Sequence, residues 1–316
     1  MSVASSKISD AYFTPPKSVD FVHDTLREHG WLNGSVLEPC CGDGNLIRGL
    51  DNVIAWDLHQ YDYPLNRVGN FLETNTGERF DLVLTNPPFG FLGGLACDIL
   101  NHATNYTDRI GIILPQCFRK IQRIDRINEF FHPVADLNLP DETYILPDGE
   151  KKYVRTCFQM WERRDYKRFK FGNRSYEEFF KQVPFEEAEY YLRTQGSTAG
   201  CILEGLAYPE TGKVYNHNSG RFMKGGKDLI EAHDWTKVAR FASGAPSIGL
   251  HDIAWGLRSP NIDEYLIHGV LYDLINDVYK EEGKKVEEAE KFVKEAHEVS
   301  KLRSKLIEKH GVGTLF

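Results

Sequence analysis

Apolar and polar positions change their spacing several times along the first half of the chain. Val19, Val22 and Leu26 recur at helical spacing, which predicts a helix over residues 18–29 that ends at Gly30. A second helix is expected to begin at residues 45–50. Short apolar runs between such segments predict strands at residues 35–38, 53–56, 67–69, 82–84, 110–114, 154–161 and 200–203. Strands that alternate with helices predict an α/β fold with a largely parallel sheet.

The pattern changes after about residue 165. A polar turn at residues 141–152 predicts a hairpin tip, and residues 196–226 are rich in Gly, Ser, Thr and Asn, as in a smaller, irregular second domain. Helical spacing returns at residues 262–279. A long charged helix with an apolar stripe is expected over residues 284–310, and it packs on the chain itself or pairs with another chain. We therefore predict domains at residues 1–165, 166–280 and 281–316.

Composition removes several classes of protein. The 316 residues are 41% apolar and 27% charged, as in ordinary globular proteins. The sequence has no 18-residue apolar run and no apolar core of signal-peptide length near its start, so we expect neither a membrane span nor export. Six scattered cysteines show no CxxC spacing, so no metal site is expected. This cysteine usage suits the cytoplasm of a prokaryotic or phage-infected cell.

Charge is unevenly distributed along the chain. The net charge is -8, which by itself argues against a nucleic-acid partner. Residues 163–228, however, hold twelve Lys/Arg and nine Asp/Glu, a local net charge of +3. Residues 163–174 combine six basic residues with three aromatic residues, a pattern that suits phosphate contacts with base stacking. A solvated linker with basic side chains is the alternative interpretation.

A glycine-rich turn follows the first predicted strand at residues 37–44. Its small residues would let the backbone approach a ligand closely. Glu38 ends the first strand, where its carboxylate could pair with a cationic group, and Asp57 ends the second, where acidic residues hold ribose hydroxyls in nucleotide-binding folds. The turn lacks the G-x-G-x-x-G spacing, so a pyrophosphate dinucleotide is not favoured over another nucleoside cofactor.

Residues 86–89, Asn-Pro-Pro-Phe, are the most informative in the chain. They follow an apolar run that predicts a buried strand, and two consecutive prolines cannot continue a strand or a helix. The chain must therefore turn at the carboxyl end of this strand, which is the edge of an open α/β sheet where ligands bind. The turn presents an amide, rigid carbonyl groups and an aromatic ring at that edge.

Together these motifs resemble those of the S-adenosylmethionine-dependent N6-adenine DNA methyltransferases. Residues 37–44 are similar to cofactor motif I of that family, residues 86–89 to catalytic motif IV, and residues 12–16 to motif X. Asp57 matches the acid of motif II, residues 69–72 match motif III with Asn70 in place of the usual Asp, and residues 110–118 match motif VI. The motif order is that of the gamma group, and the resemblance covers about residues 10–163.

The resemblance implies a Rossmann-like methyltransferase fold, with a mixed, mostly parallel seven-stranded sheet, a smaller C-terminal recognition region and a terminal helix. The implied cofactor is S-adenosyl-L-methionine. The implied cofactor-binding residues are Tyr12, Thr14, Pro15, Glu38, Pro39, Cys40, Gly42, Asp57, Leu58, Asn70 and Phe71, and the implied catalytic residues are Asn86, Pro87, Pro88 and Phe89.

The chemistry of adenine methylation explains these residue types. The exocyclic amine is a poor nucleophile because its lone pair is delocalised into the ring. The Asn86 side-chain oxygen and the Pro87 carbonyl would accept its two hydrogens and localise the lone pair, in a preorganised arrangement. Phe89 would stack on the base, and a duplex adenine must first flip out of the helix.

Substrate recognition is expected from the residues after 165 together with the basic and aromatic stretch at residues 163–174, and DNA, duplex in form, is the expected partner. Arg193 and Gln195 could read base edges or cap loops. The candidate contacts are Arg164, Lys167, Arg168, Arg193 and Gln195. Two other functions fit the motifs less well: an RNA adenine-N6 methyltransferase, and a non-catalytic module that binds the cofactor and recognises a nucleic acid or another partner. An oligomer could form through the C-terminal helix.

Overall fold

The computed structural model describes residues 11–90, 93–140, 143–167, 176–203, 205–236 and 247–258. These residues form two compact units: residues 11–115 with 126–167, and residues 116–125 with 176–258. The domain limits expected from the sequence stay predictions. The helices expected at 262–279 and 284–310, and any oligomer formed through the latter, lie outside the described residues.

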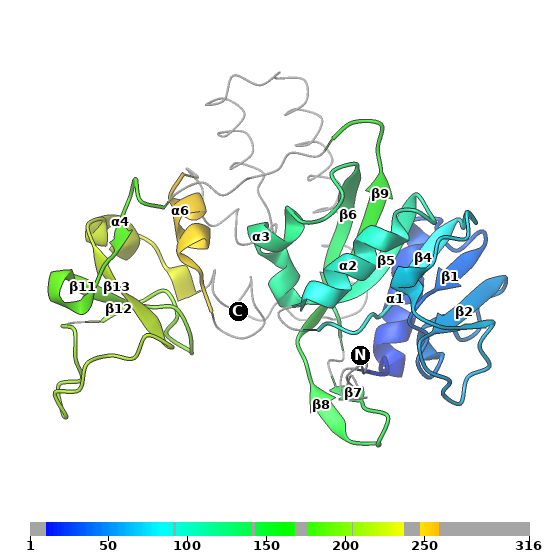
Figure 1. Cartoon of the computed structure of the whole chain (residues 1–316), viewed down its shortest axis with the longest axis horizontal. Helices are drawn as coiled ribbons and strands as arrows, with labels where there is room; N and C mark the ends of the chain where they lie inside the picture. Colours follow the sequence, from blue (N-terminus) through cyan, green and yellow to red (C-terminus); the bar gives the residue numbers. More distant parts are fainter. Residues whose placement is uncertain are drawn as a thin grey trace. The chain divides into compact units, whose positions relative to one another are not determined.

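The first unit is built on a seven-stranded sheet with the strand order β3-β2-β1-β4-β5-β9-β6 (Figure 1). Strands β3, β2, β1, β4 and β5 run parallel, and β9 is antiparallel to both of its neighbours. This topology confirms the Rossmann-like, mostly parallel fold. The elements of the unit are α1 (Pro16–Glu28), β1 (Val36–Glu38), η2 (Asn45–Ile47), β2 (Val53–Asp57), β3 (Arg67–Val68), η3 (Phe71–Glu73), β4 (Leu82–Thr85), α2 (Gly94–Ala103), β5 (Arg109–Pro115), β6 (Phe131–Asn138), β7 (Thr143–Ile145), β8 (Lys151–Tyr153) and β9 (Thr156–Arg163).

Helix α1 covers one face of this sheet. It begins at Pro16, because proline suits the first helical position, where its missing N–H needs no partner. Its apolar stripe packs in one cluster with alternate residues of β4 and with β5 and β9; the buried members include Phe21, Val22, Leu26, Leu82, Leu84, Ile113, Phe158 and Met160. Side chains alternate along a strand, so Val83 faces the opposite side of the sheet.

One element is shorter than predicted, and one strand of the sheet was not predicted. The helix expected at residues 45–50 is only the 3₁₀ turn η2, because Gly44 and Gly49, both with positive φ, bound a segment too short for an α-helix. Strand β6 was not foreseen, because Pro133 argues against a strand. Pro133 lies next to a register shift in the pairing of β6 with β9, and a sheet tolerates proline at such an irregularity.

The second unit carries a four-stranded antiparallel sheet with the order β10-β13-β11-β12. Tyr191, Tyr215 and Phe222 form its aromatic core. The strand expected at residues 200–203 is β12. The elements of the unit are η5 (Gln116–Arg119), α3 (Ile121–Ile124), β10 (Lys181–Gln182), η6 (Phe185–Glu187), β11 (Tyr190–Arg193), β12 (Ile202–Leu203), β13 (Gly220–Lys224), α4 (Lys227–Glu231) and α6 (Leu250–Arg258). Within the described ranges, no helix has the length and apolar character to cross a membrane.

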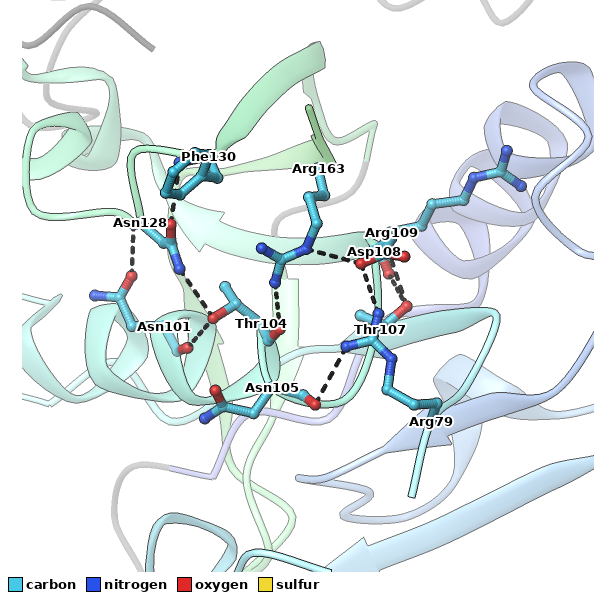
Figure 2. Close-up of polar contacts among 10 residues, drawn as sticks. All are labelled: Arg79, Asn101, Thr104, Asn105, Thr107, Asp108, Arg109, Asn128, Phe130 and Arg163. Atoms are coloured by element: carbon cyan, nitrogen blue, oxygen red, sulfur yellow. Dashed lines mark hydrogen bonds and ion pairs between the residues drawn. The ribbon is translucent and has the colours of Figure 1, made fainter. Parts of the chain in front are cut away.

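Arg79, Asp108 and Arg163 form a polar cluster just before β5 (Figure 2). Asp108 Oδ1 accepts hydrogen bonds from Arg79 Nη2 at 2.6 Å and from Arg163 Nε at 2.8 Å. The same arginines donate to the carbonyls of Asn105 and Thr104, just beyond α2, where helix carbonyls need partners. The cluster thus attaches the C-terminal end of α2 to the start of β5. It lies at the edge of the sheet opposite the carboxyl ends of the parallel strands.

Asp108→Asn is expected to lower the free energy of unfolding at pH 7 by less than about 1 kcal/mol, because ion pairs of a largely exposed side chain contribute little. Burial opposes ionisation of Asp108, but the hydrogen bonds and charges of Arg79 and Arg163 outweigh it and hold its pKa below the usual range. The ion pairs therefore give their full stabilisation above the ordinary pKa of an aspartate. This stabilisation is lost as the pH falls through the lower pKa that Asp108 has in the native protein. Urea unfolding of the wild-type protein and of Asp108→Asn from pH 7 to pH 3 measures the difference in stability between them. A difference that does not shrink with acid would contradict the electrostatic explanation.

Candidate functional site

The carboxyl ends of β1, β2, β3 and β4 meet at one edge of the sheet, because these strands are parallel. Glu38 and Asp57 end β1 and β2, and Asn70 and Asn86 follow β3 and β4. A cavity of about 310 Å³ lies at this edge. Its lining comes entirely from the first unit: Ala11, Tyr12, Phe13, Thr14, Glu38, Pro39, Cys40, Cys41, Gly42, Asp43, Leu46, Asp57, Leu58, His59, Tyr61, Gly69, Asn70, Phe71, Leu72, Asn86, Pro88, Leu95 and Ile99.

Glu38 is a buried carboxyl group with one oxygen in use. Its Oε1 accepts a hydrogen bond from the Cys40 N–H at 3.0 Å, while its Oε2 is buried and accepts none from the described residues. Burial raises the pKa of Glu38 to about 8, and the hydrogen bond from the Cys40 N–H opposes this rise only in part. A cationic ligand would give this carboxylate the partner that it lacks.

Asp57 and Asn70 are oriented by the backbone around them. Asp57 Oδ2 accepts from the Gly42 N–H at 2.8 Å and Oδ1 from the His59 N–H at 2.9 Å. The Asn70 Oδ1 accepts from the Leu72 N–H at 3.2 Å, so it begins the short helix η3. Each of these oxygens has a second lone pair for a ligand. These lone pairs suit a ribose hydroxyl at Asp57 and an amine donor at Asn70, and both roles stay predictions.

The glycine-rich turn is shaped by side chains as well as by glycines. Asp43 Oδ1 accepts from the Asn45 N–H at 3.1 Å, and Gly44 is left-handed with φ 73°. Burial, the largest cause, raises the pKa values of the Cys40 and Cys41 thiols well above the usual range, and the nearby Glu38 carboxylate raises them further. Both thiols therefore stay protonated, which agrees with small side chains in a tight turn and not with a reactive pair.

Gly44→Ala is expected to lower the free energy of unfolding more than Gly49→Ala. Both glycines have positive φ, which costs any other residue about 1–2 kcal/mol. A Cβ at Gly44 would also overlap the Tyr63 ring, whereas a Cβ at Gly49 meets nothing within 4 Å. Chemical denaturation of the two variants separates the clash from the backbone strain. Equal losses of stability would show that the Tyr63 ring moves away at little cost.

Asn86 has a fixed orientation. Its Nδ2 donates to the Tyr12 carbonyl at 2.7 Å and to the Thr14 Oγ1 at 3.0 Å. The Tyr12 carbonyl can only accept, so it determines which end of the amide is the nitrogen. The opposite end, Oδ1, is buried and has no hydrogen-bond partner among the described residues. Asn86 is one of the residues that line the cavity, and its Oδ1 is a buried acceptor without a donor among the described residues.

Phe89 is covered by another aromatic ring. It is 8% exposed and stacks on Tyr12, with ring centroids 5.5 Å apart and planes 16° apart. Phe89 and the buried Pro87 do not line the cavity, and neither does Pro15, which precedes α1. The other residues expected to bind the cofactor all line it. These placements describe the geometry, and the roles of the residues stay predictions.

Sequence reasoning missed several lining residues. Phe13 and Asp43 belong to recognised motifs but were not chosen. Leu95 and Ile99 come from α2, a helix that was not predicted although the four-residue spacing of these two apolar residues is visible in the sequence. Tyr61 had no signal of its own; its ring packs edge-on against Phe13 with centroids 5.5 Å apart.

The residues expected to contact substrate fall into both units. In the first unit, Arg164 pairs with Glu162 at 2.8 Å and Lys167 with Glu129 at 2.6 Å. Arg193 and Gln195 lie at and just beyond the end of β11 in the second unit, and Arg168 lies outside the described residues. Gln195 lines a second cavity of about 320 Å³, entirely within the second unit, with Lys120, Tyr176, Thr194, Arg221, Ser247, Ile248, Gly249, Leu250 and His251.

Comparison with known proteins adds one informative match. No family model matches the chain. Over 92 residues, 25% of this chain and 21% of the relative, it is 38% identical to a Type II methyltransferase of Thermus thermophilus. The chain resembles the S-adenosylmethionine-dependent methyltransferases. The match confirms the resemblance expected from the motifs, but the chain covers only about a fifth of the relative's length, so the match does not establish the activity.

Solved structures give weaker likenesses. The M protein of the Type I restriction enzyme EcoKI has 13% sequence identity and a TM-score of 0.36, over 90% of this chain and 75% of that chain. The 23S rRNA methyltransferase ErmE has 11% identity and a TM-score of 0.31, over 50% of this chain and 72% of that chain. Scores this low say nothing about function, and the fold rests on the strand order.

The lining of the first cavity fits S-adenosylmethionine, the cofactor that the resemblance implies. Three carboxyl groups line it, those of Glu38, Asp43 and Asp57, and among the residues that the structure describes no lysine or arginine does. Carboxylates suit the sulfonium and ammonium groups, and a bound cation favours the ionised form of Glu38, which burial disfavours in the free protein. Leu58, half exposed at the rim, and the buried Phe71 offer apolar contact for an adenine ring. A volume of about 310 Å³ lies within the usual range of ligand pockets.

Proposed function

We propose that this protein transfers a methyl group from S-adenosylmethionine to the N6 amine of an adenine in DNA. The observation that carries the proposal is the buried, unsatisfied Oδ1 of Asn86 beside the cofactor cavity. A buried acceptor without a donor costs free energy, so it marks a place where a ligand donor belongs. The exocyclic amine of adenine is a donor of this kind.

The geometry supports localisation of the amine's lone pair. Asn86 cannot turn its nitrogen toward the substrate without losing the bonds to Tyr12 and Thr14. The Pro87 carbonyl accepts no hydrogen bond from the described residues, and its ring fixes the local backbone. Two preorganised acceptors would hold both hydrogens of the amine and stabilise the positive charge that develops on the nitrogen. When bound, the cofactor supplies an electrophilic methyl group.

DNA is preferred to RNA as the substrate. The partial resemblance to a Type II methyltransferase supports this choice. A base within a duplex must leave the stack to reach Asn86, and Phe89 would then stack on it. The second unit would supply sequence recognition, with Gln195 at a cavity that also contains Lys120 and Arg221. An amide beside two cations suits a base edge close to phosphates.

The test is incubation of the whole protein with S-adenosylmethionine labelled in its methyl group and with separate pools of unmethylated DNA and RNA, followed by nucleoside analysis. Label in N6-methyladenosine from RNA and none from DNA would make the protein an RNA methyltransferase. Cofactor binding without transfer to either pool would favour a non-catalytic module. The proposal requires label in N6-methyldeoxyadenosine.

A further inference from the structure

The Tyr12 side chain has surroundings that its place at the cofactor cavity does not explain. Its ring stacks on Phe89, with centroids 5.5 Å apart. The buried ring of Tyr144 lies edge-on to it at 6.0 Å. Its hydroxyl accepts a hydrogen bond from Lys152 Nζ at 2.9 Å, and the same ammonium group lies 5.2 Å from the ring centre. Tyr12 is thus held from several sides.

The β7–β8 hairpin provides most of this support. Tyr144 lies in β7 and Lys152 in β8, directly opposite each other in the antiparallel pairing. The Phe13 N–H donates to the Ile145 carbonyl at 2.9 Å, so the backbone next to Tyr12 is also attached to β7. The hairpin therefore fixes Tyr12 against the aromatic ring of the Asn-Pro-Pro-Phe turn.

No base fits between the two rings in this arrangement. Stacked atoms lie about 3.5 Å apart at closest approach, so a base between Tyr12 and Phe89 would need about 7 Å between their planes. The centroids are only 5.5 Å apart, and Phe89 is 8% exposed. Access to this face of Phe89 requires the Tyr12 ring to move.

We propose that Tyr12 is a stand-in for the target base: its ring covers Phe89 in the free protein, Lys152 holds it there, and the incoming base displaces it. The inference rests on the proposed function, because it takes the base to stack on Phe89. The Tyr12 carbonyl holds Asn86, so rotation of the side chain alone can open the site and leave the catalytic amide in place. Tyr12 is then a positioning residue that sets the affinity for the base.

Lys152→Met tests this, with Lys151→Met as the matched control. Both changes remove one positive charge from β8, and Lys151 is exposed. Loss of attraction to phosphates would raise the KM for DNA equally in both variants. Release of the Tyr12 ring would instead lower the KM for DNA, because the base would displace the ring more easily. We expect the KM of Lys152→Met for unmethylated plasmid DNA to be about three- to tenfold below that of Lys151→Met, with kcat unchanged.

A KM of Lys152→Met equal to or above that of Lys151→Met would overturn the inference while leaving the proposed function intact. If the wild-type protein methylates no DNA, the proposed function fails instead. The hold on Tyr12 is measured without DNA by a double-mutant cycle of Tyr12→Phe and Lys152→Met in urea unfolding. We expect a coupling of about two- to fivefold in the unfolding equilibrium constant; additivity would show that the hydrogen bond from Lys152 to the Tyr12 hydroxyl does not hold the ring.

Discussion

Asn86→Ala is expected to lower the rate of methyl transfer by about 10²–10³-fold, the usual loss when one preorganised polar group is removed from a site of charge development. The variant removes the Asn86 Oδ1, the side-chain acceptor proposed for the amine. Its Kd for S-adenosylmethionine should change little, because the carboxyl groups that attract the cofactor stay in place. Single-turnover rates with saturating DNA, together with calorimetric titration of the cofactor, measure both effects.

Thr14→Val and Thr14→Ser separate the orientation of Asn86 from its presence. Valine has nearly the shape of threonine but cannot accept the hydrogen bond from Asn86 Nδ2, whereas serine can. We expect a loss of rate of about tenfold for valine and a smaller loss for serine. If Asn86→Ala keeps more than a tenth of the wild-type rate, the Asn86 oxygen is not the acceptor that activates the amine.

Glu38→Gln is expected to have opposite effects on cofactor affinity and on the stability of the free protein. Glutamine keeps the shape and the acceptor for the Cys40 N–H but cannot ionise. A cofactor that carries positive charge should then bind about tenfold or more weakly, since its anionic partner is gone. Titration with S-adenosylhomocysteine, whose sulfur is uncharged, shows whether the sulfonium or the ammonium group is the partner of Glu38.

The stability effect follows from proton linkage. The pKa of Glu38 is about 8 in the native protein and near 4.5 when the chain is unfolded. Between these values the native state keeps a proton that the unfolded state releases, so stability falls as the pH rises, by about 1.4 kcal/mol per pH unit. The glutamine variant avoids this loss and should be the more stable protein at pH 8, with the difference vanishing toward pH 4.5. Urea unfolding across this range measures it, and parallel pH profiles for the two proteins would mean that Glu38 is already ionised in the free protein.

The sequence predicted most strands of the sheet and the edge that carries the candidate site, because both depend on local signals. Apolar runs that end in Glu38, Asp57 and Asn86 mark strands and their carboxyl ends, and parallel pairing brings these ends together. Strand β6 was missed because Pro133 argues against a strand unless the irregular pairing with β9 is known.

The contacts that orient the site were beyond reach of the sequence for a different reason. The bonds from Asn86 to Tyr12 and Thr14 join residues more than seventy positions apart, and Lys152 is separated from Tyr12 by 140 positions. The motifs indicated that Phe89 would face a base. No local pattern indicated that Tyr12 would cover it.

The path of the chain between the two units has a consequence for how such proteins diversify. Residues 116–125 leave the first unit after β5 and belong to the second, where Lys120 donates to Ser247 at 3.2 Å, before the chain returns to form β6. The second unit is therefore encoded in two separate stretches. Exchange of the C-terminal half with that of a relative would replace only one of them, so if the second unit recognises the target, as proposed, a new specificity acquired by recombination must preserve, or change in step, the ten residues that stay behind.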